Sequence, residues 1–304
     1  MQGQLPPLGR MYEVGAGDSR SEGRQLMLHR SGSGGPAVVL LPGAGLVGLD
    51  FLNIQAGAAQ FTTSVLYDRA GTGWSDPATL PRTPNEVTDE LRELLRAAGT
   101  PGPYLLVGHS LGAFYARRYA QRFPDEVAGL LLLDPGHEDI HTYMPEEVAG
   151  MSDQLKRDPD TLPDRLTDEQ IRLAREQWAQ LYARWPTEVR EQLIKHNLAS
   201  WRTAFVEVLN FETEVYEELR GGGALPDVPL TVLTAGGTNP YWAQFMPEKL
   251  LREAHDGLRS LHAAMAAAVP RGEHHEVAGA SHQYLHIEHR DAVLDALREL
   301  HAKA

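Results

Sequence analysis

The sequence contains no cysteine among its 304 residues. This absence excludes disulfide bonds, thiolate nucleophiles and cysteine metal ligands. Basic residues are also scarce, because 28 lysines and arginines stand against 41 aspartates and glutamates, which gives a net charge of −13. A chain this acidic repels nucleic acid phosphates and anionic lipid surfaces, so we expect neither nucleic acid nor a membrane as a partner.

Long uncharged apolar runs are missing as well. No run approaches the roughly 20 residues that a membrane-spanning helix needs, and residues 1–10 lack the apolar centre of a signal peptide. We therefore expect a soluble, cytoplasmic protein. Hydrophobic residues make up 42% of the chain, which suffices for a large globular core.

Short β-rich runs alternate with helical patterns through most of the chain. Some of these runs, such as 38–41 and 130–133, are continuously apolar, as expected of parallel strands that are buried on both faces. The alternation predicts an α/β fold with a mostly parallel eight-stranded sheet and helices on both faces. The predicted strands are 11–14, 25–29, 37–41, 63–68, 104–107, 129–134, 230–235 and 274–277. The predicted helices outside the central part of the chain are 86–98, 110–122, 248–268 and 291–301.

The β-pattern disappears between Gly136 and about Gly223. Charged helical patterns replace it, including 168–185 and 187–220, and their aromatic residues recur at roughly helical spacing. We therefore predict that residues 137–223 form a helical cap, or lid, inserted into a core domain of residues 1–136 and 224–304. Most of these aromatic side chains are expected to pack the insertion, and a minority to line a substrate pocket.

The pentapeptide 108–112, Gly-His-Ser-Leu-Gly, is the most informative motif in the chain. It follows an apolar run and opens a helical pattern, which predicts that Ser110 lies at a sharp turn between a strand and a helix. Glycine at both ends of the motif allows the strand and the helix to approach closely. Ser110 is therefore the predicted catalytic nucleophile.

A serine hydroxyl needs a base to take its proton and a buried carboxylate to orient that base. Among the 13 histidines, His282 follows the last predicted strand, in a loop at the carboxyl edge of the sheet, and is the predicted base. The loop after the preceding strand, 236–242, contains no carboxylate. Asp134 ends the strand before that one, so it is the predicted acid, with Glu138 and Asp139 as alternatives.

Such a site also needs N–H groups that stabilise the developing oxyanion. One predicted donor is the amide of Leu111, the residue after the nucleophile. The second is predicted in the loop 41–45, Leu-Pro-Gly-Ala-Gly, whose glycines let the backbone turn its N–H groups inward, and we assign it to Ala44. The proposed groups require no cofactor and no metal ion.

Four segments in order resemble the α/β-hydrolase superfamily, in its serine esterase and lipase form. The loop 41–45 is similar to the superfamily's oxyanion loop, 67–75 to its D-x-R-G-x-G-x-S segment, 108–112 to its nucleophile elbow, and the position of His282 to its histidine. The resemblance implies the α/β-hydrolase fold with a helical cap. Members most often carry the acid after the seventh strand, whereas Asp134 corresponds to the minority that place it after the sixth.

The resemblance and the motifs predict a serine hydrolase that cleaves an uncharged, fairly apolar ester or lactone through an acyl-enzyme. Acyl transfer, thioester hydrolysis and carbon–carbon bond hydrolysis use the same groups and stay open as alternatives. Epoxide hydrolases and haloalkane dehalogenases look excluded, because they carry an aspartate where this chain has Ser110.

Two other classes of function compete with hydrolysis. His282 and His286 have the i, i+4 spacing of a helical metal site, but Gln283 stands where a zinc protease needs a glutamate. A protein that binds a small ligand without turning it over is the other class. The retained serine, histidine and oxyanion-loop glycines favour an enzyme.

Overall fold

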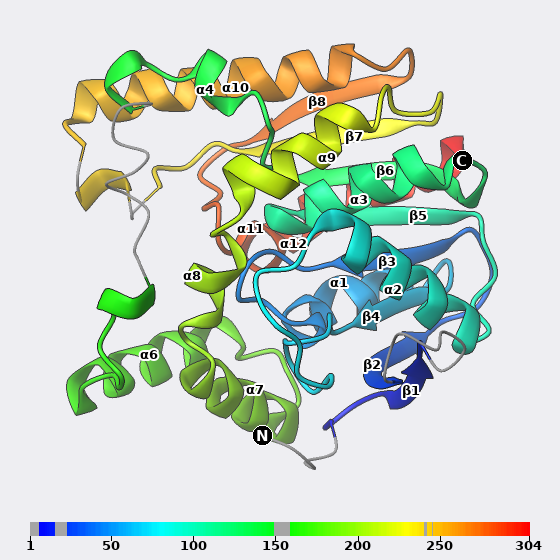
Figure 1. The fold of residues 1–304 in the computed structure, drawn as a ribbon, viewed down its shortest axis with the longest axis horizontal. Helices are drawn as coiled ribbons and strands as arrows, with labels where there is room; N and C mark the ends of the chain where they lie inside the picture. Colours follow the sequence, from blue (N-terminus) through cyan, green and yellow to red (C-terminus); the bar gives the residue numbers. More distant parts are fainter. Residues whose placement is uncertain (1–5, 16–22, 149–158, 240–241, 245) are drawn as a thin grey trace.

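The computed structural model describes residues 6–15, 23–148, 159–239, 242–244 and 246–304. These residues form one eight-stranded sheet with the strand order β1-β2-β4-β3-β5-β6-β7-β8 (Figure 1). β2 runs antiparallel to both of its neighbours, and all other adjacent strands are parallel. The strands are β1 (Arg10–Val14), β2 (Arg24–Ser31), β3 (Ala37–Leu41), β4 (Ser64–Tyr67), β5 (Tyr104–His109), β6 (Val127–Leu133), β7 (Leu230–Ala235) and β8 (Gly272–Val277).

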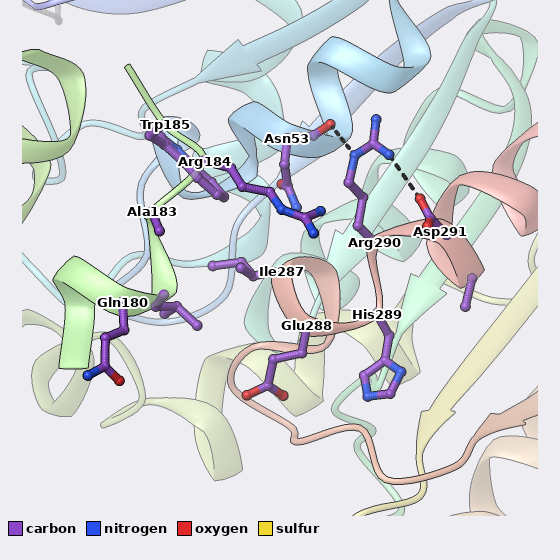
Figure 2. A pocket seen from close by; sticks show the side chains of 12 residues that line it. Asn53, Gln180, Ala183, Arg184, Trp185, Ile287, Glu288, His289, Arg290 and Asp291 are labelled. Atoms are coloured by element: carbon purple, nitrogen blue, oxygen red, sulfur yellow. Dashed lines mark hydrogen bonds and ion pairs between the residues drawn. The ribbon is translucent and has the colours of Figure 1, made fainter. Parts of the chain in front are cut away.

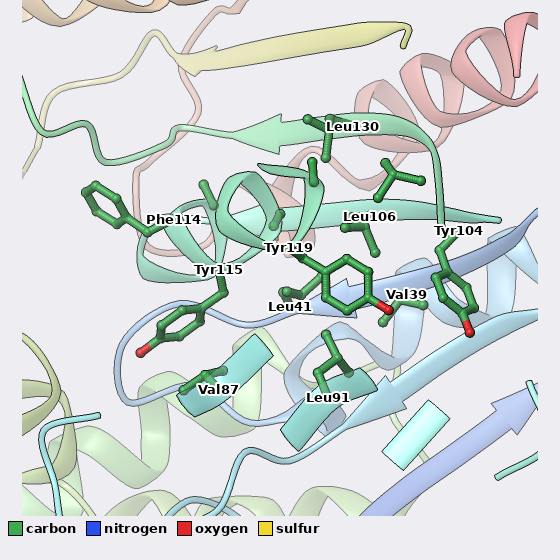
Figure 3. Close-up of a cluster of buried hydrophobic side chains, with 14 of the residues drawn as sticks. Val39, Leu41, Val87, Leu91, Tyr104, Leu106, Phe114, Tyr115, Tyr119 and Leu130 are labelled. Carbon is green, nitrogen blue, oxygen red and sulfur yellow. The ribbon is translucent and has the colours of Figure 1, made fainter. Parts of the chain in front are cut away.

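Helices cover both faces of the sheet, as the sequence predicts. Successive residues of a strand point to opposite faces, so Val39 and Leu41 of β3 pack in one apolar cluster while Val38 and Leu40 pack in another. The first cluster lies under α2 (Pro84–Ala97), α3 (Leu111–Arg122), α9 (Tyr216–Gly221) and α10 (Glu248–Ala267). Figure 3 shows side chains of β3 and β5 meeting those of α2 and α3. The second lies under α1 (Leu52–Ala58) and α12 (Arg290–Lys303).

The segment 137–223 contributes most of the remaining helices. Its described helices are α4 (Ile140–Tyr143), η3 (Pro159–Thr161), α6 (Asp168–Leu181), α7 (Thr187–Ala199), α8 (Thr203–Glu207), η4 (Phe211–Val215) and α9. α6, α7 and α8 lie together beside the sheet, whereas α4 packs on α10 (Figure 1). Residues 149–158 of this segment lie outside the described residues. Short helices elsewhere are η1 (Gly48–Phe51), η2 (Pro124–Glu126), η5 (Trp242–Gln244) and α11 (Leu285–Glu288).

The structure corrects the helix predicted over 187–220. This stretch is divided into α7, α8, η4 and α9. Ser200 follows the end of α7, and Thr213 lies at a kink within η4. Their hydroxyls donate to the carbonyls of His196 (2.8 Å) and Asn210 (3.2 Å) and so compete with regular helical pairing.

The helix predicted over 168–185 is also shorter, because α6 ends at Leu181. Trp185 lies beyond this end, with its indole N–H donating to the Leu49 carbonyl at 2.8 Å, and Pro186 follows. The residue before a proline is disfavoured in a helix, and here Trp185 serves to anchor the segment on the core instead.

Within the described residues, no helix has both the length and the apolar composition needed to cross a membrane.

Candidate active site

Three of the predicted residues meet at the carboxyl ends of the strands. Ser110 follows β5, Asp134 follows β6, and His282 lies in the loop between β8 and α11. The Ser110 hydroxyl lies 3.1 Å from Nε2 of His282, and Nδ1 of His282 lies 2.5 Å from Oδ2 of Asp134. The structure therefore brings hydroxyl, imidazole and carboxylate together in the order that nucleophilic catalysis by serine needs.

Ser110 occupies a strained turn between β5 and α3. Its φ of 50° and ψ of −115° are rare for a residue with a side chain. The neighbouring backbones are so close that a Cβ on Gly108 would lie 2.6 Å from the carbonyl oxygen of Gly112. A Cβ on Gly112 would lie 2.0 Å from the carbonyl oxygen of Leu41. Both glycines are required by this packing, which lifts the serine out of the sheet.

Asp134 is held rigidly at the end of β6. It is 6% exposed, and its Oδ1 accepts a hydrogen bond of 2.9 Å from the N–H of Ala235 on the adjacent strand. Burial raises the pKa of Asp134, but the hydrogen bond and charge of His282 outweigh burial and bring that pKa down to about 2. Burial likewise favours neutral His282, yet Asp134 raises the pKa of His282 above its ordinary value. The pair therefore stabilises the imidazolium that forms when serine loses its proton.

His109, the second residue of the pentapeptide, positions the loop that carries His282. The His109 side chain is buried, and its Nε2–H donates to the backbone carbonyl of His282 at 2.7 Å. Burial is the main reason why the pKa of His109 falls to about 3, so this ring is neutral. The motif therefore supplies both the serine and a support for its partner histidine.

The two alternative acids lie elsewhere. Glu138 forms a buried ion pair with Arg117, with nitrogen–oxygen distances of 2.8 and 2.7 Å. Asp139 is half exposed and pairs with Arg220 at 3.2 Å. Neither carboxylate forms a hydrogen bond with His282, whose Nδ1 already donates to Asp134.

The two predicted oxyanion donors come from two separate segments of the chain. Leu111 begins α3, and Ala44 lies in the loop after β3. This loop passes beside the serine, since a Cβ on Gly43 would lie 3.3 Å from Cβ of Ser110. The N–H of Gly45 donates to Glu207, whereas the N–H groups of Ala44 and Leu111 donate to no other protein group in the described part of the chain.

A cavity of about 610 Å³ opens beside Ser110 and His282. Its walls come from α4, α6, η4, η5 and α10, and from the loops that follow β6, β7 and β8. Asp134 is the only aspartate, glutamate, lysine or arginine among the described residues that line it. The apolar side chains in its wall are Pro135, Ile140, Phe211, Trp242, Leu251 and Leu258. The cavity therefore suits an uncharged, apolar group.

A second cavity, of about 550 Å³, lies between the end of α6 and the start of α12 (Figure 2). Arg184 and Arg290 extend toward it, together with the carboxylates of Glu288 and Asp291. Arg290 is held by Asp291 at 2.9 Å. None of the three catalytic candidates is among the described residues that line this cavity, so the candidate active site is the first cavity.

His282 and His286, which were considered as a metal site, are not arranged to bind one ion together. Both ring nitrogens of His282 are engaged, one by Ser110 and the other by Asp134. His286 is fully buried and stacks on Phe51, with a distance of 3.9 Å between ring centroids. No lone pair of His282 is left for a metal ion in this arrangement.

Two buried groups near the site have no local signal in the sequence. His262 of α10 lies 3.9 Å from Oδ1 of Asp134, and its Nε2–H donates to the carbonyl of Pro135 at 3.0 Å. Glu207 of α8 accepts the N–H of Gly45 at 2.7 Å. Their sequence surroundings are ordinary helix, so only long-range packing shows that they support the site.

Comparison with known proteins identifies the family and agrees with the observed fold. A family model described as "Alpha/beta hydrolase family" matches residues 38–296. The chain belongs to this family. The superfamily assignment and the α/β-hydrolase fold predicted from the sequence are thereby confirmed. The matched stretch contains β3 except for its first residue, strands β4 to β8 and the three residues Ser110, Asp134 and His282.

Individual relatives match shorter stretches. The uncharacterized protein YqjL of Bacillus subtilis (strain 168) is 35% identical over 122 residues, which are 40% of this chain and 48% of YqjL. The (lyso)-N-acylphosphatidylethanolamine lipase of Homo sapiens is 33% identical over 117 residues, or 37% of this chain and 34% of the lipase. The matches therefore span about half or less of each relative's length.

Solved structures extend the likeness to the whole fold. A thermophilic esterase from Thermogutta terrifontis has a TM-score of 0.62 and 18% identity, covering 96% of this chain and 99% of the esterase. At this identity the likeness concerns the fold.

Proposed function

We propose that this alpha/beta hydrolase is a serine hydrolase that cleaves an uncharged, fairly apolar ester or lactone. The observation that carries the proposal is the hydrogen-bonded chain from Ser110 through His282 to Asp134. The esterase with the same fold and the lipase relative support an ester substrate. No step of the proposed reaction requires a cofactor.

The reaction proceeds in two halves. Ser110 Oγ attacks the carbonyl carbon while its proton passes to Nε2 of His282, and the amides of Ala44 and Leu111 hold the oxyanion. His282 then gives the proton to the leaving alkoxide, which departs as an alcohol and leaves an acyl-serine. A water molecule repeats the sequence, so that the acid is released and Ser110 regains its proton. With a lactone, the alcohol and the acid are parts of one product.

We further propose that residues 137–223 act as the cap over a core of residues 1–136 and 224–304. Ile140 of α4, Gln177 of α6 and Phe211 of η4 contribute walls to the cavity beside Ser110. The substrate therefore contacts both parts of the chain. Substitutions of these three side chains are expected to change which acyl groups are preferred, while the nucleophilic attack by Ser110 stays the same.

Covalent labelling tests the proposal directly. A fluorophosphonate probe reacts with activated serines, and it is expected to modify the peptide that contains Ser110 stoichiometrically. Hydrolysis of p-nitrophenyl butyrate should fall in proportion to the labelled fraction. Mass spectrometry of the digested protein identifies the modified residue. Turnover that persists after complete labelling, or a label on another serine, would contradict the assignment.

The cavity also predicts which esters are preferred. A neutral hexanoate ester of p-nitrophenol is expected to exceed the corresponding mono-ester of adipate in kcat/KM by at least about 100-fold. The adipate carboxylate would be buried in a cavity whose described lining contains no lysine or arginine to pair with it. Initial rates over a substrate series, with p-nitrophenyl acetate as the reference, give this ratio. Equal values for the two esters would rule out an uncharged acyl pocket.

A further inference from the structure

A buried ion pair lies against the loop that carries the proposed oxyanion donor. Arg69 follows β4, and Glu207 ends α8. Nε and Nη2 of Arg69 donate to Oε1 of Glu207 at 3.2 and 2.9 Å, and the two side chains are 2% and 4% exposed. Two charges this deeply buried are retained only with close partners, so the pair is rigid.

The pair holds three consecutive peptide units of the loop. Nη1 and Nη2 of Arg69 donate to the carbonyls of Pro42 and Gly43 at 2.7 and 3.1 Å. Oε2 of Glu207 accepts the N–H of Gly45 at 2.7 Å. Each side chain therefore contacts both its ionic partner and the loop backbone.

These contacts set the direction of the Ala44 N–H. A trans peptide is planar, so its C=O and N–H point in opposite directions. Because the Gly43 carbonyl is bound by Arg69, the N–H of Ala44 in the same peptide unit points away from Arg69. Gly43 itself lies next to Ser110, since an added Cβ would come within 3.3 Å of Cβ of the serine.

Glu207 also joins this loop to a distant part of the chain. Gly45 has a φ of 71°, and a Cβ at this position would lie 2.6 Å from Cβ of Ala204, one turn before Glu207 in α8. The loop is thus enclosed between Arg69 on one side and α8 on another. Removing the carboxylate would leave the buried guanidinium without its counter-charge and the Gly45 N–H without its acceptor.

We propose that Glu207, acting through Arg69 and Gly45, is a positioning residue that aims the Ala44 N–H at the oxyanion. This inference rests on the proposed serine hydrolase function. It makes the oxyanion donor dependent on the docking of α8, a helix of the segment 137–223. Glu207 then contributes to stabilising the transition state without touching the substrate.

Two variants test the role of Glu207. Glu207→Ala is expected to lower kcat for p-nitrophenyl butyrate by about 100-fold, the scale of a lost oxyanion donor, with KM nearly unchanged. Glu207→Gln retains the shape and one acceptor oxygen but loses the charge. Its oxygen can accept either from Arg69 or from the Gly45 N–H and not from both, so it should lose about 10-fold in kcat. Rates are expressed per active site, titrated to completion with the fluorophosphonate probe, so that misfolded protein does not contribute.

A second readout reports the oxyanion donors directly. A trifluoromethyl ketone adds to an active serine and places a charged oxygen among these donors. Its inhibition constant is expected to rise in Glu207→Ala by the same factor by which kcat falls. A defect that only loosens the fold would lower the melting temperature without moving these two quantities together.

Glu90→Ala is the matched control. Glu90 is also buried, pairs with Arg82 at 3.1 Å and accepts a backbone N–H, that of Ala70, at 3.0 Å, but it forms no hydrogen bond or ion pair with the described loop 42–45. This variant is expected to melt at a lower temperature while keeping the wild-type kcat per labelled site and the wild-type affinity for the ketone.

The outcomes separate the two proposals. Wild-type kcat per site in Glu207→Ala, or equal losses in Glu207→Ala and Glu90→Ala, would overturn the positioning role while ester hydrolysis stands. If Glu207→Ala does not fold, Glu207→Gln decides by the same comparison. A wild-type protein that neither turns over esters nor reacts with the probe would overturn the proposed function itself.

Discussion

Replacing Ser110 with alanine is expected to lower kcat for p-nitrophenyl butyrate on the order of 10⁶-fold, leaving only what binding and the oxyanion donors provide. The substitution removes the single oxygen that faces Nε2 of His282. Alanine keeps the Cβ that the elbow already accommodates at a φ of 50°, so the turn and the fold should persist. Steady-state rates, together with the loss of the initial burst of p-nitrophenol that acyl-enzyme formation produces, measure the effect.

Ser260→Ala serves as the matched control for Ser110→Ala. Ser260 is exposed on α10, where its hydroxyl donates to the Asp256 carbonyl at 2.8 Å, and it lies outside the cavity. Wild-type kinetics are expected for this variant. Were Ser110→Ala to retain more than about one hundredth of the wild-type kcat, a nucleophile other than Ser110 would have to be sought, because triad serines contribute far more than that.

The sheet could be predicted closely from the sequence because its signals are local. Its central strands are continuous apolar runs between breaks in the pattern, and runs of this kind have few other ways to be buried. β6 was expected over 129–134 and is found at Val127–Leu133, and β7 lies at the predicted residues. The carboxyl ends of these strands then determine where the site lies.

The helices that were missed or misplaced depend on distant packing. α1 has no clear periodicity, and its Gly57 resembles a loop residue in the sequence. In the structure this glycine allows contact with α12, because a Cβ on Gly57 would lie 2.3 Å from Leu294 Cδ1. The irregularities within 187–220 have a different cause, because they coincide with local hydrogen bonds of small polar side chains, which a hydrophobic pattern does not register.

The candidate site likewise contains residues with a local signal in the sequence and residues without one. Ser110 stands out through its glycines, and His282 through its place after the last strand. Asp134 was selected because the loop 236–242 has no carboxylate, and the structure places it 2.5 Å from His282. Glu207 could not be found, since nothing near it in the sequence shows that its partners are Arg69 and the loop 42–45. Supporting contacts of this kind arise only when separate segments fold together.

Replacing Asp134 with asparagine is expected to lower kcat about 10⁴-fold, the scale seen when a triad acid is made neutral. Asparagine has nearly the same shape and keeps an oxygen for the Ala235 N–H. Its amide NH₂ would face Nδ1 of His282 as a donor, however, so the imidazole would carry its proton on Nε2. In that tautomer His282 cannot accept the proton of Ser110.

The pH dependence of kcat/KM gives an independent test of Asp134. Activity requires neutral His282, so kcat/KM is low at a pH below the pKa of His282 and rises as the pH increases through that pKa. Asp134 raises this pKa in the wild type, and removing its charge is expected to move the acidic limb to lower pH. Glu138→Gln and Asp139→Asn should keep both kcat per active site and the wild-type limb, because these carboxylates pair with Arg117 and Arg220. A severe loss of kcat in Glu138→Gln or Asp139→Asn, together with an active Asp134→Asn, would assign the role of the acid to the residue whose substitution causes the loss.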